Sequence, residues 1–218
     1  MEEHGVFCEA IADNSNQKIV FKENIEGIDE WPKNFPAGEI SYRLNNFSDD
    51  LSKKWQIRAV TVALRVWQWR IDKLKFRRER NPDVHVDANV EWKDLAHFGG
   101  RKGVFAHGYF PGQGDISGDV HLNDYWDYVV SSKWQDLSHA PMVPIMVHEF
   151  GHSIIGLRHD PITPDAMMYP SFNLGRKKWK LHSRDVSRAQ ERHGARTIDQ
   201  RIIDYFAGRR LIGGDFRE

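Results

Sequence analysis

The stretch from residue 147 to residue 160 combines residue types that bind a metal ion and move a proton. His148 and His152 are four residues apart, and Glu149 follows the first of them. On a helix, side chains four residues apart share a face, so both imidazoles can reach one metal ion and Glu149 can reach a water beside it. His159 follows after a glycine, Gly156. Three neutral nitrogen ligands with an open fourth position are typical of a catalytic zinc site, not a structural one.

These residues predict hydrolysis of a peptide bond. Zinc lowers the pKa of its bound water toward neutrality, and Glu149 accepts the proton and later passes it to the leaving amine. The metal also polarises the scissile carbonyl and stabilises the charge that develops on its oxygen. A chance HExxH pattern on an exposed helix is the alternative, and the presence of Gly156 and His159 argues against it.

Composition places few limits on the function. A chain of 218 residues suits one domain with extensions or two small domains. The formal net charge is zero, which implies no general attraction to nucleic acid or membrane. A single cysteine, Cys8, rules out an intramolecular disulfide and fits a reducing compartment. The first residues lack the pattern of a signal peptide, and no stretch is typical of a transmembrane helix, so we expect a cytoplasmic or packaged protein over a secreted one. The oligomeric state is not predicted.

Apolar periodicity predicts the elements that position the site. A helix is expected from Leu51 to about Arg70, with an apolar stripe that packs on a sheet. Pro144 lies in the first turn of the active-site helix, and Gly156 ends it. A last helix is expected over residues 183–193. Strands are expected at residues 39–44, 84–90, 103–110 and 119–122.

Three other segments are less clearly patterned. Residues 1–30 are interpreted as a loose leader with one strand at residues 18–22. Residues 73–80 are interpreted as a basic turn. Residues 195–218 are predicted to hold a short amphipathic helix that packs on the body or on a partner.

Several segments beyond the zinc helix resemble the catalytic domain of a matrix metalloproteinase (matrixin), in the metzincin clan. Ala166-Met167-Met168-Tyr169-Pro170-Ser171-Phe172 resembles the Met-turn of the family, which implies that Met168 lies beneath the zinc. The segment Val104-Phe105-Ala106-His107-Gly108-Tyr109-Phe110-Pro111-Gly112 resembles the edge strand and the loop after it. Gly118-Asp119-Val120-His121 resembles the GDxH segment. The resemblance covers about residues 31–194.

The resemblance implies an α+β fold with a twisted five-stranded mixed sheet, two long helices and a C-terminal helix. It divides the chain into an N-terminal extension (1–30), a catalytic domain (31–194) and a helical tail (195–218). The implied activity is that of a zinc endopeptidase acting on extended protein or peptide segments. A substrate strand would pair with the edge at Phe105 and Ala106. One wall of the pocket for the side chain after the scissile bond would be formed by Pro170, Ser171 and Phe172.

One departure from the family concerns the third zinc ligand. The family pattern is HExxHxxGxxH, and this chain has one extra residue within Ser153-Ile154-Ile155. One inserted residue rotates everything beyond it by about 100° in a regular helix. We expect a π-type bulge, or a different bend after Gly156, to bring His159 to the metal, with Asp160 as the substitute ligand.

The structural metal sites of the family are also altered. A second, structural zinc would be bound by Asp94, His107 and His121. Trp92 stands where the family has a further histidine, and His97 is the candidate to replace it. The acidic calcium-binding positions are occupied by Gly99, Asn123 and Trp126. A calcium requirement is therefore doubtful, because a hard cation needs several carboxylates.

The thiol-based inhibition of the family has no counterpart here. Cys8 lies in Gly5-Val6-Phe7-Cys8-Glu9, which matches no propeptide motif. We interpret Cys8 as a small hydrophobic residue and not as a thiolate that blocks zinc. How the activity is restrained is not predicted.

Two rival functions are less well supported. A catalytically inactive zinc-binding module is the first, but it has no use for the carboxylate of Glu149. Nucleic-acid binding through residues 53–80 is the second, because Trp67 and Trp69 alternate there with basic residues. A helix packed on a sheet already explains those residues, so nucleic acid is not favoured as a partner.

Overall fold

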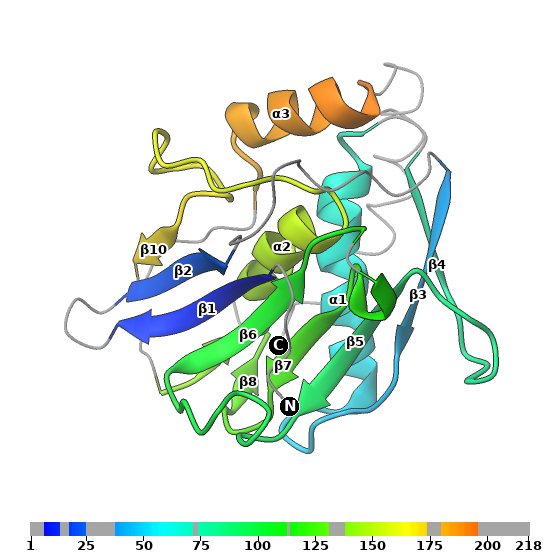
Figure 1. Ribbon diagram of the computed structural model, residues 1–218, viewed down its shortest axis with the longest axis vertical. Helices are drawn as coiled ribbons and strands as arrows, with labels where there is room; N and C mark the ends of the chain where they lie inside the picture. Colours follow the sequence, from blue (N-terminus) through cyan, green and yellow to red (C-terminus); the bar gives the residue numbers. More distant parts are fainter. Residues whose placement is uncertain are drawn as a thin grey trace.

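The computed structural model describes residues 7–13, 18–24, 38–71, 74–112, 114–130, 138–173 and 180–195. Within these ranges the chain forms a mixed α+β fold, as predicted (Figure 1). Its elements are β1 (Phe7–Asp13), β2 (Lys18–Asn24), β3 (Glu39–Leu44), α1 (Lys53–Gln68), β4 (Lys75–Arg78), β5 (Ala88–Lys93), β6 (Val104–Tyr109), the 3-10 turn η1 (Gly114–Ile116), β7 (Val120–Asn123), β8 (Tyr128–Val129), β9 (Ala140–Pro141), α2 (Met142–Ser153), β10 (Ser171–Asn173) and α3 (Ser183–His193). No described helix is long and apolar enough to cross a membrane.

The main sheet is larger than the five strands that we expected. Its order is β10-β2-β1-β6-β7-β5-β3-β4, so eight described strands take part. Strands β4, β3, β5 and β7 run parallel to one another, and β6 is antiparallel to β7. Of these five strands, β3, β5, β6 and β7 correspond to predicted strands, and β4 does not. The additional strands β1, β2 and β10 continue the sheet beyond β6 with antiparallel pairing.

The interpretation of a loose leader is therefore wrong for residues 7–13, whereas the strand predicted at residues 18–22 is confirmed as β2. These residues form a hairpin whose first strand pairs with β6, about a hundred positions later in the chain. A strand edge such as that of β6 carries unpaired backbone groups that readily accept another strand. Local periodicity does not reveal so distant a pairing.

Two helices position the active-site residues against the sheet. In Figure 1, α1 and α2 lie together on one face of the sheet, and α3 lies across their ends. The predicted apolar stripe of α1 is buried, and its Trp67 donates an indole hydrogen bond to the carbonyl of Val147 at 2.8 Å. Every residue of α2 is buried. Because α2 has no solvent-facing side, the polar side chains of this helix must find their hydrogen-bond partners within the protein.

Most predicted boundaries are confirmed to within a few residues. The active-site helix starts at Met142, with Pro144 in its first turn, and α3 has the predicted ends. Gly194 follows α3 with a φ of 84°, as expected of a glycine that ends a helix. The predicted helix at residues 195–218 lies outside the described residues, apart from Ala195.

Two strand predictions were wrong. The predicted basic turn contains β4, whose strand pattern is hidden because Phe76 is its only apolar residue. The strand expected at residues 84–90 starts at Ala88 instead. The residues before it form a turn, which the guanidinium of Arg43 holds by donating hydrogen bonds to the carbonyls of Asn81, Pro82 and Val84.

Candidate metal centre

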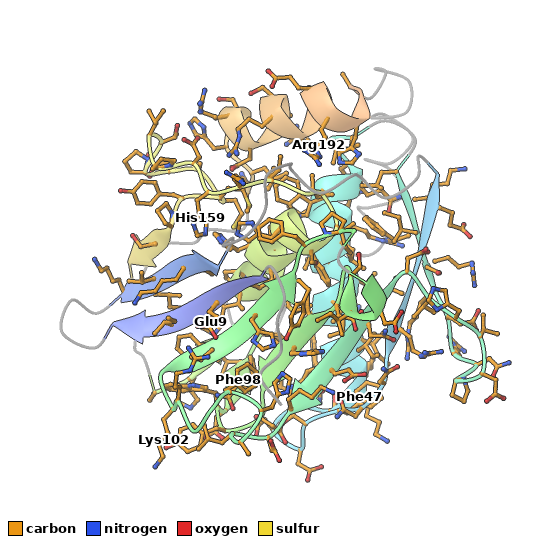
Figure 2. All side chains as sticks on the ribbon, in the orientation of Figure 1. Glu9, Phe47, Phe98, Lys102, His159 and Arg192 are labelled. Atoms are coloured by element: carbon orange, nitrogen blue, oxygen red, sulfur yellow. The ribbon has the colours of Figure 1, made fainter. Side chains whose placement is uncertain are left out.

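Three histidine side chains converge at the end of α2. The Nε2 atom of His148 lies 3.0 Å from that of His152 and 3.2 Å from that of His159. Nitrogens around a tetrahedral zinc ion at about 2.0–2.1 Å would be separated by roughly 3.3 Å. These three residues can therefore hold one metal ion, and His159, labelled in Figure 2, supplies the nitrogen from outside the helix.

Backbone carbonyls fix the orientation of the two helical imidazoles. The Nδ1–H of His148 donates to the carbonyl of Met167 at 2.8 Å, and the Nδ1–H of His152 donates to that of Leu157 at 2.5 Å. With Nδ1 protonated, the lone pair of each Nε2 points to the shared position. Burial lowers the pKa of His152 well below its ordinary value and that of His159 to about 4. Both rings are therefore neutral at pH 7, as metal binding requires.

The extra residue before Gly156 is absorbed by a wider last turn of the helix. The amides of Ile154 and Ile155 both donate to the carbonyl of Phe150, at 3.1 and 3.0 Å. The amide of Leu157 reaches back to the carbonyl of Gly151 at 2.8 Å, a bond of the Schellman type lengthened by one residue. This is the π-type irregularity that we predicted.

Beyond this turn the chain reverses toward the helix. Gly156 has a φ of 70°, which only glycine adopts readily, and the next residues return His159 to the other two histidines. Asp160, the substitute ligand, has other partners. Its backbone amide donates to the carbonyl of Met168, and its carboxylate accepts from Arg184 at 2.8 Å.

Glu149 lies where strand β6 passes close to α2. A Cβ atom on Gly108 would lie 3.0 Å from the Glu149 Oε2 and 3.1 Å from the Glu149 carbonyl oxygen. A larger residue at position 108 would therefore press on this carboxylate. Glu149 is fully buried and directly follows His148 in the helix, so its carboxylate is shielded from bulk water.

The Met-turn packs against helix α2. A Cβ on Gly151 would lie 2.3 Å from the Met168 Sδ and 2.9 Å from the Trp67 ring, so the methionine packs directly against the helix backbone. Asp185 of α3 holds this turn, because its carboxylate accepts from the amides of Met167 at 2.7 Å and Met168 at 3.0 Å.

Sequence reasoning missed the role of Asp185. The residue is fully buried and also accepts from the backbone of His182, forming a capping box at the start of α3. A carboxylate three residues after a capping residue was the available signal, but it indicates a helix start and not a support for the metal centre.

A second histidine cluster lies on the opposite face of β6 from α2. The Nε2 atoms of His97 and His107 are 3.1 Å apart, and each lies 3.0 Å from the Nδ1 of His121. These three residues can also hold one metal ion. Burial lowers the pKa of His107 well below its usual value and that of His121 to about 3, so both rings are neutral at pH 7.

Asp94, which we expected as a ligand, is not one of this cluster. Its carboxylate accepts a hydrogen bond from the backbone amide of His97 at 3.0 Å. The aspartate thus shapes the turn that carries His97. His97 itself joins His107 and His121, as expected of the candidate for the histidine that Trp92 replaces.

Two of the altered calcium positions hold hydrogen-bond donors. The side-chain amide of Asn123 donates to the carbonyl of Val104 at 2.7 Å, and the indole of Trp126 donates to the same oxygen at 3.1 Å. The third, Gly99, has a φ of 62° within a turn. A carbonyl that already accepts two hydrogen bonds has no lone pair left for a cation.

The segments predicted to bind substrate both contact the N-terminal hairpin. Ala106 of β6 pairs with Ala10 of β1, and the carbonyl of Pro170 accepts from the amide of Phe21 at 2.7 Å. The ring of Phe21 stacks on the ring of His148, with centroids 3.5 Å apart. Nothing in the sequence pattern had singled out Phe21.

Comparison with known proteins agrees with this geometry. Residues 30–194 match the matrixin family. Among curated proteins, mouse stromelysin-1 is 31% identical over 183 residues, covering 81% of this chain and 35% of that protein. Matrix metalloproteinase-18 of Xenopus laevis is 31% identical over 72% of this chain and 32% of that protein, and mouse interstitial collagenase B is 32% identical over 71% and 32%. The chain thus spans about a third of the length of these relatives.

Proposed function

Because the chain belongs to the matrixin family, we propose that it is a zinc-dependent endopeptidase that cleaves extended segments of proteins. The observation that carries the proposal is the convergence of three imidazole Nε2 atoms, at 3.0 and 3.2 Å, at the end of a helix that also carries the buried Glu149 directly after His148. A zinc site with a structural role alone would have no need for such a carboxylate.

In this proposal His148, His152 and His159 hold the catalytic zinc. The bound ion supplies Lewis acidity to the scissile carbonyl and to the attacking water. Glu149 accepts a proton from that water on its carboxylate and returns it to the leaving amine. Met168 and Asp185 keep the base of the site rigid, so that the imidazoles need no rearrangement during the reaction.

The substrate is proposed to bind as an extended strand. The edge of β6 at Phe105 and Ala106 would supply the backbone hydrogen bonds, and Pro170, Ser171 and Phe172 would line the pocket for the side chain after the scissile bond. Support comes from β1, an antiparallel strand that pairs with β6 through Ala106. The edge of β6 is thus able to accept an extended chain.

The second cluster is proposed to bind a structural zinc. His97, His107 and His121 offer three neutral nitrogens at one position, a donor set that suits zinc better than calcium. This ion would tie the turn at residues 94–100 to strands β6 and β7. Calcium has no place in the proposal.

The test is cleavage of a peptide library by the purified chain, with and without a zinc chelator. We expect cleavage that the chelator abolishes and that added zinc restores. An intact chain that binds zinc but cleaves no peptide, even in the hairpin variants described below, would instead be an inactive zinc-binding module.

A further inference from the structure

The hairpin of β1 and β2 occupies the place in the sheet that an extended substrate would take. We propose that this hairpin is an intramolecular inhibitor of the peptidase, with Phe21 as the side chain that blocks the metal centre. The inference rests on the proposed endopeptidase function. The hairpin strands would then restrain peptidase activity without the help of a cysteine.

Backbone pairing is the first part of the evidence. Strand β1 pairs with β6 along Phe7 to Ile11, and β6 pairs on its other side with β7. Strand β2 pairs with β10, next to the Met-turn. Since the outer strands of the described sheet are β10 and β4, β6 has no free edge while the hairpin is in place. A peptide substrate cannot then add to β6.

Side-chain burial is the second part. Ala10, Ile19 and Phe21 are buried and lie on one face of the hairpin, which packs on the α2 side of the sheet. The ring of Phe21 is 2% exposed and lies nearly parallel to the His148 ring, at an angle of 18°. It also contacts His159 edge-on, with centroids 6.5 Å apart. An aromatic ring therefore covers two of the three candidate zinc ligands.

An ion pair on the other face fastens the hairpin to the domain. Glu9 of β1, labelled in Figure 2, accepts two hydrogen bonds from the guanidinium of Arg101, one of them at 2.6 Å. The Nε of Arg101 also donates to the carbonyl of Phe98 at 3.0 Å, so the guanidinium is held in position. Two hydrogen bonds from one guanidinium to one buried carboxylate fix the relative orientation of the two side chains and also stabilise the contact.

Such a device changes enzyme kinetics in a specific way. A substrate binds only the fraction of molecules in which the hairpin has left β6. The apparent KM therefore rises with the equilibrium constant for docking of the hairpin on β6. At saturating substrate all molecules are open, and kcat is unaffected. A hairpin with a purely structural role would instead lower kcat or stability when it is weakened.

The experiment weakens the docking in the full chain at two independent places. Phe21→Ala removes the ring on His148, and Arg101→Ala removes the ion pair. With a quenched fluorescent peptide chosen from the library, we expect each variant to lower KM about tenfold or more, with kcat within about twofold of wild type. Zinc content and thermal unfolding show whether each variant is folded.

Neighbouring residues supply the controls. Val20→Ala changes the half-buried opposite face of β2, and Lys102→Ala removes the adjacent cation, so both should match wild type. Cys8→Ala should also match wild type, whereas activation by that variant alone would assign the block to a thiolate. A synthetic peptide of residues 7–24 should inhibit the Phe21→Ala variant competitively, and the same peptide with Phe21→Ala should not.

A binding measurement separates this inference from the proposed function. In chains that also carry Glu149→Ala, the affinity for the uncleaved peptide should rise about tenfold or more when Phe21→Ala is added. A rise without hydrolysis by any variant supports the hairpin as a block on peptide binding at β6 and refutes the peptidase. Hydrolysis with unchanged KM in folded Phe21→Ala and Arg101→Ala variants refutes the inhibitor and leaves the peptidase standing.

Discussion

Gly151 of α2 and Met168 of the Met-turn are in direct contact, since a Cβ atom on Gly151 would come within 2.3 Å of the methionine sulfur. The helix that carries two histidines can approach the Met-turn only because position 151 has no side chain. Gly151→Ala should destabilise the protein by about 1–3 kcal/mol, the usual cost of overpacking a core. Thermal unfolding of Gly151→Ala and of Gly151→Ala with Met168→Ala checks this.

Met168→Ala alone should also destabilise the protein, because it leaves a cavity in the core, so its unfolding is measured as well. The double variant should cost less than the two single changes added together, because the new Cβ no longer meets the methionine sulfur. Part of the cost of Gly151→Ala should remain, because its Cβ would still lie 2.9 Å from the Trp67 ring. Equal stability of Gly151→Ala and wild type would show that the two segments can move apart at no cost.

Glu149→Ala should abolish peptide hydrolysis while zinc content stays at the wild-type value. The carboxylate is proposed to move a proton and not to bind the metal, since the three imidazoles form the ligand set. Metal analysis of the purified variant, together with its hydrolysis rate, checks both parts. Unchanged cleavage would refute the role of Glu149 as base, and loss of zinc would make that role structural.

The close approach of Gly108 gives a related test. Gly108→Ala would place a methyl group 3.0 Å from the Glu149 Oε2, so kcat should fall with zinc content unchanged. Ala106→Gly, on the same face of β6, serves as a comparison for changes to the strand itself. Wild-type kcat in Gly108→Ala would show that Glu149 tolerates displacement.

His121→Ala should reduce the metal content of the chain by about one equivalent, from about two. The remaining nitrogens of His97 and His107 cannot hold the ion as tightly, and the turn at residues 94–100 loses its anchor. Metal analysis and thermal unfolding should both change, whereas His85→Ala, at an exposed position, should change neither. One zinc in both wild type and variant would mean that the second cluster binds none.

The buried carboxyl group of Asp119 should make the unfolding free energy of the protein depend on pH. Burial raises its pKa to about 7, although the backbone and side chain of Asn89 donate hydrogen bonds to its carboxylate. The folded state therefore binds this proton more tightly than the unfolded state. The contribution of Asp119 to stability is largest below about pH 4 and falls as pH rises to about 7.

Asp119→Asn should remove this contribution, because an amide stays neutral and can still accept from the Asn89 backbone. The difference in unfolding free energy between variant and wild type should grow in favour of the variant from pH 5 to pH 8. Asp115→Asn, on the exposed η1 turn, is the matched control. A difference that stays constant with pH would show that Asp119 is ionised throughout.

The catalytic centre could be predicted from the sequence because its geometry is local. His148 and His152 sit on one helix, whose pitch fixes their separation, and His159 follows within eleven residues of the first. Helix ends were equally local, since Gly156 and Gly194 take the positive φ that ends a helix. The extra residue was predicted to need an irregular turn, but its hydrogen bonds to Phe150 and Gly151 were left open.

Only the tertiary structure decided the features that join distant parts of the chain. Strand β1 of the hairpin pairs with β6 through backbone amides and carbonyls. Because every residue other than proline carries the same two backbone groups, the sequence does not show which strand β1 will pair with. His97 joins the second cluster and Asp94 does not, because the turn at residues 94–100 directs the His97 ring to His107 and His121 and the Asp94 carboxylate to the turn's own backbone. Phe21 and His148 are 127 positions apart in the chain. Their rings meet because the pairing of β2 with β1 and of β1 with β6 brings Phe21 to the helix that carries His148.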